Sequence, residues 1–111
     1  MKRGDIYTAA TGSGYGSKPR PVLIVQADAF RMTSKTLVAL IGDPVEGAAP
    51  VRVTVEPNAV NNLTKISEVM VDAILPVRPE NFGKHIGRLE DADLRRVEAA
   101  LVLFFGIGST S

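Results

Sequence analysis

Two charged residues of this sequence stand where a charge needs a structural or chemical reason. Arg20 lies between Pro19 and Pro21, directly before an apolar run, and the two prolines restrict the backbone that carries it. A planar, permanently charged guanidinium suits a phosphate group, although the same side chain could orient a loop by donating hydrogen bonds to carbonyl groups. Asp72 interrupts another apolar run, where a carboxylate could act as a general base or acid or form a structural ion pair with an arginine.

Few residues remain for other kinds of catalytic chemistry. The sequence has no cysteine and one histidine, His85, so a metal centre would depend almost entirely on carboxylates, and we expect neither a metal nor a cofactor. The segment 11–21 is rich in glycine, serine and proline and is predicted to be a loop, but its glycines lack the order of a phosphate-binding loop. Tyr15 in this loop could stack on a nucleobase or be an exposed turn residue, and His85 is interpreted as a surface residue.

Short β-branched runs separated by turn residues predict a mainly β fold around these side chains. One amphipathic helix is expected near the C-terminus, because Leu94, Val97 and Leu101 recur at three- to four-residue spacing before Gly106. At 111 residues the chain is expected to form one domain, 1–111, built as a small β-barrel or curled sheet with a covering helix. The strands are expected at 4–10, 22–25, 37–41, 51–55 and 69–75, the last closed by Pro76, and the helix at 90–105.

Composition and charge narrow the class of protein. With 45% hydrophobic and 23% charged residues the composition is that of a globular chain and argues against disorder. The net charge is only +1, but residues 1–35 hold six basic and two acidic side chains, which fits a phosphate-bearing partner or a solvated basic face. No apolar run approaches membrane-spanning length and no secretory signal is recognised, so a cytoplasmic location without membrane association is expected.

The order of several sequence blocks resembles the MazF/PemK/Kid family of toxin endoribonucleases of type II toxin–antitoxin systems. The blocks follow one another in the family's order and extend over nearly the whole chain. They are the start 1–7, Gly16-Ser17, the run 20–30 from Arg20-Pro21 to Phe30, the run 67–74 around Asp72, and Ile86-Gly87-Arg88-Leu89 before the helix.

This resemblance implies an SH3-like β-barrel of about five to seven strands with a C-terminal amphipathic helix, acting as a homodimer. It also implies metal-independent cleavage of single-stranded RNA, often mRNA, and neutralisation by an antitoxin with an acidic, disordered C-terminal tail. The residue types fit this chemistry, because attack by a ribose 2′-OH on the adjacent phosphorus needs no cysteine or histidine nucleophile. It needs a base, a cation for the phosphorane and an acid for the 5′ oxygen. Independently, the single covering helix and the apolar faces of the fifth strand favour a homodimer.

The resemblance assigns roles to individual residues. Arg20 matches a phosphate clamp that stabilises the transition state, and Asp72 matches an acid/base carboxylate of part of the family. Ser17 matches a position where some members place a hydrogen-bonding residue. Lys18 and Tyr15, in the loop before Arg20, are expected to contact RNA.

The sequence departs from the family at places that matter for activity. Many members end the third strand with a Thr-Ser pair that supplies a catalytic hydroxyl, whereas this chain has Gly42-Asp43, and Asp43 is expected to replace that hydroxyl among the RNA contacts. Met70 stands where some members have arginine, and Ala73 stands where the family commonly has glutamine. A weakened nuclease, altered sequence preference or a degenerate RNA-binding member would follow.

A second class of function stays open on the same fold. CcdB-like toxins bind DNA gyrase without catalysis, and a shared fold does not determine the activity. In that case the apolar C-terminal residues 104–108 would form a partner surface rather than part of the core. The Arg20-Pro21 block favours the nuclease, because a gyrase-binding toxin has no need of a phosphate clamp at this place.

Overall fold

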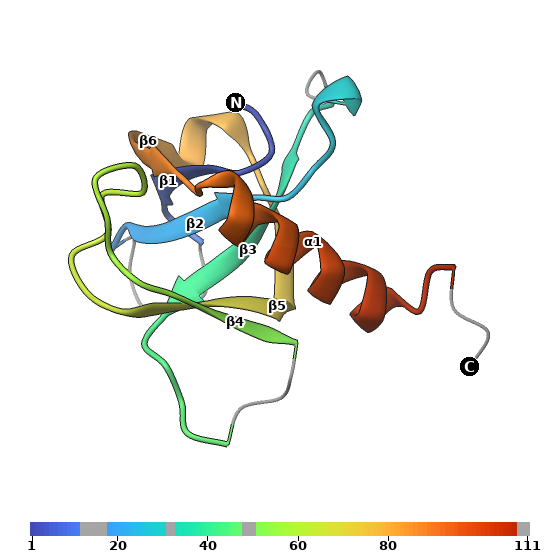
Figure 1. Ribbon diagram of the computed structural model, residues 1–111. Coiled ribbons are helices and arrows are strands. Elements are labelled where there is room, and N and C mark those ends of the chain that lie inside the picture. The colour runs from blue at the N-terminus through green and yellow to red at the C-terminus, as the bar shows by residue number, and fades with distance from the viewer. Residues whose placement is uncertain (12–17, 31–32, 48–50, 109–111) are drawn as a thin grey trace.

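The computed structural model of the protein describes residues 1–11, 18–30, 33–47 and 51–108. These residues form six strands, two short 3-10 turns and one α-helix (Figure 1). The mainly β class with a C-terminal helix, expected from the β-branched runs, is thereby confirmed. In chain order the elements are β1 (Asp5–Ala9), β2 (Arg20–Ile24), η1 (Asp28–Phe30), β3 (Thr36–Gly42), β4 (Arg52–Val55), β5 (Ser67–Val77), η2 (Pro79–Asn81), β6 (Phe82–Arg88) and α1 (Asp91–Phe105).

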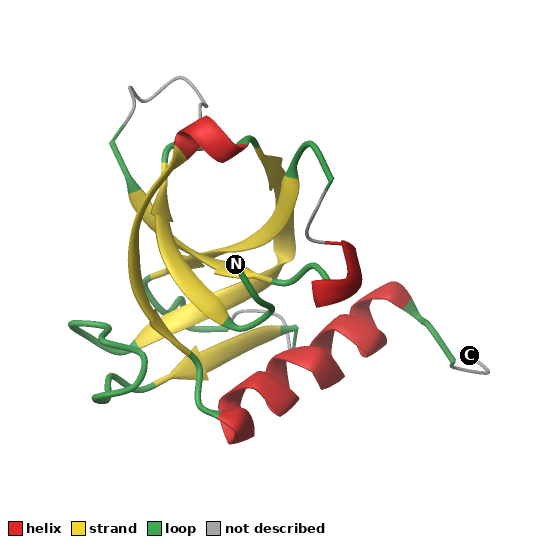
Figure 2. Cartoon of the chain, turned by 90° about the horizontal axis from the view of Figure 1, so that it is seen from above, coloured by secondary structure: helices red, strands yellow, loops and turns green. Residues whose placement is uncertain are grey.

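All six strands belong to one antiparallel sheet in the order β4-β5-β3-β2-β1-β6. The sheet curls strongly, and α1 lies along one flank of it (Figure 2). Among the described residues β4 and β6 do not pair with each other, so the expected barrel is a curled, open sheet. In the central strand β2, Val22, Leu23 and Ile24 are buried, as the continuous apolar run after Pro21 predicted.

The two faces of the sheet bury separate apolar clusters, because neighbouring side chains of a strand point to opposite faces. One face packs against α1 and includes Leu23 and Ile41. The other face includes Val22 and Val38, packed with partly buried rings of β1 and β6. A sheet with cores on both faces holds its central backbone rigidly, which fixes the position of any side chain at the ends of β2 and β3.

The helix α1 begins and ends close to the predicted residues. Glu90 is its N-terminal cap, and Gly106 ends it in the left-handed conformation, with φ of 66°. Its first three turns bury Leu94, Val97 and Ala100, whereas residues 102–108 are exposed. In the described part of the chain, no helix is long and apolar enough to cross a membrane.

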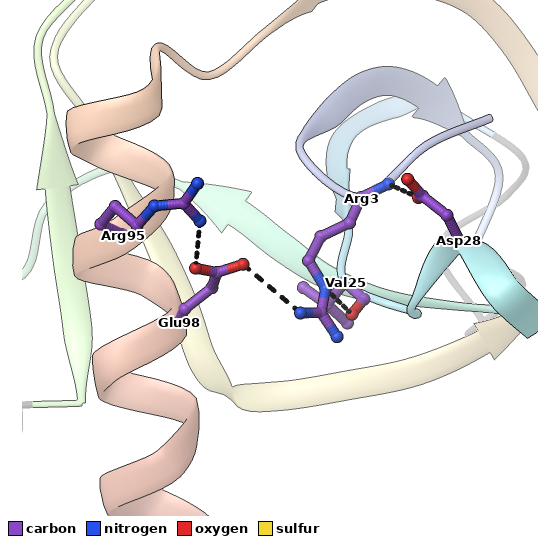
Figure 3. Close-up of polar contacts among 5 residues, drawn as sticks. All are labelled: Arg3, Val25, Asp28, Arg95 and Glu98. Carbon is purple, nitrogen blue, oxygen red and sulfur yellow. Dashed lines mark hydrogen bonds and ion pairs between the residues drawn. The ribbon is translucent and has the colours of Figure 1, made fainter.

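Arg3 connects the start of the chain to Val25, the residue after β2, and to α1 (Figure 3). Its Nε donates to the carbonyl of Val25 at 2.9 Å, and its Nη1 lies 3.4 Å from Oε2 of Glu98. Arg95 binds the other oxygen of Glu98 at 2.6 Å, and the backbone N–H of Arg3 donates to Asp28 at 2.8 Å. The helix is therefore held to the sheet by a charged link in addition to its apolar face.

The structure corrects the predicted elements at two places. The sixth strand, β6, was not expected, and β5 does not end before Pro76 but includes it, with Pro76 opposite Leu37 of β3. At Pro76 the strand is an edge, because β4 pairs only with the segment Ser67–Met70 of β5. A proline without an N–H is tolerated at an edge strand, where no hydrogen bond to a second neighbour is lost.

Candidate active site

Arg20 is the first residue of β2 and its side chain is exposed. It lies opposite Ala9 of β1, and the next residues of β2 are buried, so the strand holds the Cα of Arg20 in a defined place. Among the described residues, no hydrogen bond or ion pair is formed by its guanidinium. The structure thus presents a cation from a rigid strand end, available to a ligand that carries a negative charge.

The pairing register shows which side chains share the sheet face of Arg20. Arg20 is on the face of Val22, two residues further along β2, and Val22 lies opposite Tyr7 on one side and Leu40 on the other. Leu40 in turn lies opposite Met70. Directly paired residues of antiparallel strands place their side chains on the same face, so Arg20, Gly42, Met70 and Asp72 belong to one face.

Asp72 does not stand alone on this face, because Arg52 of β4 holds both of its oxygens. The Nε and Nη2 atoms of Arg52 lie 3.1 and 3.2 Å from the two carboxylate oxygens of Asp72. The Nη1 atom of Arg52 also reaches Oε1 of Glu68 at 3.5 Å. The structural ion pair that the sequence left open for Asp72 is therefore present, and one guanidinium bridges two carboxylates.

The surroundings of the two carboxylates differ. The Asp72 side chain is 31% exposed and that of Glu68 only 5%, so Glu68 depends more on its ion-pair partner. Hydrogen bonds and charge from Arg52 lower the pKa of Asp72 below its ordinary value, against a smaller opposing effect of burial. At neutral pH Asp72 is a carboxylate, which can accept a proton but has none to donate.

The structure does not bring Arg20 and Asp72 into contact. They belong to β2 and β5, and β3 lies between these strands, which puts about 10 Å of sheet between the two backbones. Residues 71–73 of β5 have no partner in β3, because the register shifts between the pairs Leu40–Met70 and Ala39–Ile74. This irregular segment directs Asp72 to Arg52 on the far side of β5.

Gly42 and Met70, the two positions where the sequence departs from the resemblance by lacking a hydroxyl and an arginine, are adjacent in space. Gly42 ends β3, and a Cβ atom added to it would lie 2.6 Å from Cε of Met70. The Met70 side chain therefore occupies the space that a larger residue at position 42 would need. Asp43, which was expected to substitute for the hydroxyl, is exposed and forms an ion pair of 2.7 Å with Lys65.

The remaining predicted contacts lie before β2. Lys18 is exposed, and no described residue forms an ion pair with it. Tyr15 and Ser17 lie outside the residues that the structure describes.

Arg52 and Glu68 were not predicted from the sequence as members of the site. The alternation of 51–55 indicated that Arg52 faces away from the helix-covered core, but its partners depend on the β4–β5 register, which the sequence does not reveal.

Possible metal ligands do not cluster. Within the described ranges, no group of three or more histidine, aspartate or glutamate side chains could hold a metal ion. The site is thus an exposed arginine at one strand end and, two strands away on the same face of the sheet, two carboxylates that share the single guanidinium of Arg52.

Comparison with known proteins gives this arrangement a family. Residues 2–105 match the sequence model described as the PemK-like, MazF-like toxin of type II toxin–antitoxin system. The chain belongs to this family. A probable endoribonuclease MazF from Mycolicibacterium smegmatis is 38% identical over 107 residues, which cover 96% of this chain and 98% of that protein.

Solved structures of MazF-type proteins have the same fold. The Mycobacterium tuberculosis toxin MazF-mt6 is 28% identical, with a TM-score of 0.76 over 92% of this chain and 96% of that one. An endoribonuclease in complex with its cognate antitoxin, from a mycobacterial species, has a TM-score of 0.80 at 24% identity, with 96% of each chain covered. The comparisons identify a MazF-like toxin of the endoribonuclease class and favour it over the gyrase-binding alternative.

Proposed function

We propose that this MazF-like toxin cleaves single-stranded RNA, mRNA included, without a metal ion. A ribose 2′-oxygen attacks the adjacent phosphorus while its proton passes to a base, and the bond from phosphorus to the 5′ oxygen breaks as that oxygen takes up a proton from an acid. The products carry a 2′,3′-cyclic phosphate and a 5′-hydroxyl group. Cleavage of mRNA would stop its translation in the cytoplasm, where the protein is expected to act.

The exposed guanidinium of Arg20 is the observation that carries this proposal. The backbone of Arg20 is held by a strand whose later residues are buried, and the guanidinium makes no ion pair with a described residue, so its charge is available to the phosphorane, on which negative charge develops. Lys18, two residues earlier, adds a second cation at the same strand end. Ser17 and Tyr15 complete the proposed contacts of RNA on the preceding segment.

Asp72 is proposed as the general base rather than the acid. Its ion pair with Arg52 keeps it ionised at neutral pH, and an ionised carboxylate can accept the 2′-OH proton. The separation between Asp72 and Arg20 requires that the RNA extends across β3 to reach both. Asp43, beside Gly42 at the end of β3, lies along this path and can contact RNA once its exposed pair with Lys65 opens.

A homodimer is proposed from the exposed apolar end of α1. A groove of about 290 Å³ between the helix and the sheet is lined by Leu37, Ile74 and Phe105, among others, and further apolar side chains extend beyond it. An exposed apolar patch on a folded domain marks an interaction surface. The exposed residues at this end are Val102, Leu103, Phe104, Phe105 and Ile107.

An antitoxin partner is proposed as well. One mycobacterial structural neighbour is an endoribonuclease in complex with its cognate antitoxin. For this chain we infer a partner with an acidic, disordered C-terminal tail, which would cover Lys18 and Arg20 and thereby exclude RNA.

Cleavage of a long single-stranded RNA in EDTA tests the reaction, with analysis of the product ends. The wild type is expected to leave 2′,3′-cyclic phosphate and 5′-hydroxyl ends, and Arg20→Ala to lower the rate at least about 100-fold. Arg95→Ala is the matched control, because Arg95 is exposed on α1, and it should cleave normally. Full activity of Arg20→Ala would exclude the assignment, and no cleavage of several different RNAs by the wild type would exclude the reaction.

A further inference from the structure

The face that carries Arg20 has two ends with different electrostatics. Toward β4 and β5, Arg52 is neutralised by Asp72 and Glu68, and Lys65 by Asp43. At the start of β2, Lys18 and Arg20 form no ion pair with any described residue. A polyanion is therefore attracted to the start of β2.

Aromatic rings gather at this cationic end. Tyr7 of β1 contacts His85 of β6, with ring centroids 4.9 Å apart, and Phe82, with centroids 5.8 Å apart at 72°. Phe82 packs on the apolar cluster below and anchors the group. The side chain of His85 is 51% exposed, and its Nε2 lies 3.8 Å from Oδ1 of Asp5 in β1. Tyr7 is half-buried, so the exposed imidazole has a carboxylate near its Nε2 and a second ring beside it.

The register places these rings beside Arg20. Tyr7 lies opposite Val22, and Arg20 comes two residues before Val22 on the same face. Tyr7 and Arg20 are therefore diagonal neighbours, about 7–8 Å apart, a separation that aromatic and long side chains bridge. His85 lies opposite Tyr7 in β6, one strand further from Arg20. A phosphate held at Arg20 leaves the base of a neighbouring nucleotide within reach of these rings.

We propose that Tyr7 and His85 form a stacking platform for a nucleobase next to the scissile phosphate, so that this part of the RNA crosses β2, β1 and β6. The platform rests on the proposed function, because it assigns a subsite to the same RNA. Stacking on aromatic rings favours single-stranded nucleic acid, whose bases are free to leave one another, and it accepts every base. The strand would thus run from the bare cations at β2 onto the rings of β6.

The tyrosine content of the chain provides a direct measurement. The sequence has no tryptophan and two tyrosines, Tyr7 and Tyr15, so in a Tyr15→Phe background the emission comes from Tyr7 alone. The probe is a short 2′-O-methylated single-stranded RNA of mixed sequence, which lacks the attacking hydroxyl and is not cleaved. Its addition is expected to quench the Tyr7 emission saturably, and a strand of equal length without bases should not quench it.

Variants separate stacking from a purely structural role of the rings. Tyr7→Leu and His85→Leu keep a bulky side chain in the sheet and remove the aromatic face, and each is expected to weaken binding of the probe about tenfold. Tyr7→Phe keeps the ring, and no described residue is hydrogen-bonded to the tyrosine hydroxyl, so it should restore binding in an assay with labelled probe. Ile66→Leu, an exposed residue beside β5, is the control that should bind normally.

The outcomes distinguish this platform from the reaction itself. If the wild type cleaves RNA but Tyr7→Leu and His85→Leu bind and cleave as it does, the platform is excluded and the reaction stands. If the probe quenches Tyr7 but no RNA is cleaved, the platform is supported and the nuclease reaction is excluded. Melting curves identify a variant that has unfolded, and in that case the quenching of Tyr7 in the Tyr15→Phe background decides alone.

Discussion

At the level of single residues, the ion pair of Asp72 decides between two interpretations that the sequence left open. A carboxylate inside an apolar run suggested either a group with raised pKa or an ion pair. Arg52 decides in favour of the ion pair, because it binds both oxygens and lowers the pKa of Asp72. The carboxyl group of Asp72 is therefore ionised at neutral pH, as a general base must be, and its charge also contributes to stability.

This contribution depends on pH in a defined direction. Because the pKa of Asp72 is lower in the folded chain than in the unfolded chain, the ion pair stabilises the fold above the ordinary aspartate pKa of about 3.9. The stabilisation is lost as the pH falls through the folded-state pKa. Asp72→Asn is therefore expected to lower the free energy of unfolding by about 0.5 kcal/mol at pH 7, a small effect because the pair is partly exposed.

Urea unfolding of Asp72→Asn and the wild type at pH 7 and below pH ~3 measures this difference. The difference should vanish at the acidic pH, where Asp72 is protonated. Asp91→Asn is the control, because Asp91 is more exposed and lies 3.6 Å from Arg88. An equal loss of stability for Asp72→Asn at both pH values would contradict the assignment.

Two departures from the family are explained together at the residue level. Met70 and Gly42 were read from the sequence as separate losses of an arginine and of a hydroxyl. In the structure the end of the Met70 side chain lies where a Cβ of residue 42 would be, so the space at each position depends on the other residue. The Met70 thioether, which has no hydrogen-bond donor, thus lies beside the position where the resemblance led us to expect a hydroxyl.

At the level of elements, a strand could be predicted from the sequence where its own residues show a continuous apolar run or a regular apolar–polar alternation. The buried run of β2 and the alternation of β4 are properties of the local sequence. β6 contains two glycines and three basic or imidazole side chains, which do not predict a strand. Its position instead depends on pairing with β1 and on contact with the loop 57–65. The Arg52–Asp72 pair was equally beyond prediction, because it depends on a register and on an irregularity within β5.

Gly87 in β6 provides a test of how that strand is held. A Cβ atom at this position would lie 2.5 Å from the carbonyl oxygen of Val60 and 2.7 Å from that of Asn61. Both atoms belong to backbone, and Asn61 is fully buried, with its side chain bound to Asn58, Glu56 and Leu63. The loop has little freedom to move away.

Gly87→Ala is therefore expected to lower the free energy of unfolding by about 2 kcal/mol, the usual range of an overpacked site. Chemical denaturation monitored by circular dichroism measures the change. Lys84→Ala, at an exposed position of the same strand, should leave stability nearly unchanged. A Gly87→Ala protein as stable as the wild type would show that the loop 57–65 does not fix β6.

At the level of the whole molecule, the C-terminal end of α1 exposes a cluster of large apolar side chains that the sheet does not cover. The helix buries Leu94 and Val97 but leaves Phe105 55% exposed, although the sequence placed Phe104 or Phe105 on the same apolar stripe. The stripe continues past the edge of the sheet, and a second copy of the chain would cover it. The homodimer expected from the single covering helix and the apolar faces of the fifth strand is therefore proposed to form through this surface.

Phe105→Glu is expected to convert the dimer to a monomer, because a charge at the groove would have to be buried in the interface. Sedimentation at micromolar concentration should give twice the chain mass of 11.8 kDa for the wild type and the single chain mass for the variant. Ile66→Glu, beside the other end of the helix, should remain dimeric. A wild-type monomer would exclude the proposal.

The pairing of Arg52 and Lys65 with carboxylates of their own sheet has a consequence for ionic strength. Cations that are already paired with carboxylates of the protein do not displace the counterions condensed on a nucleic acid, so only cations without such a partner contribute to the salt dependence. With Lys18 and Arg20 as the two phosphate contacts, log affinity plotted against log salt should fall with a slope of about −1.4. A toxin that reads its RNA mainly through stacked bases would therefore hold its substrate over a wide range of salt concentrations.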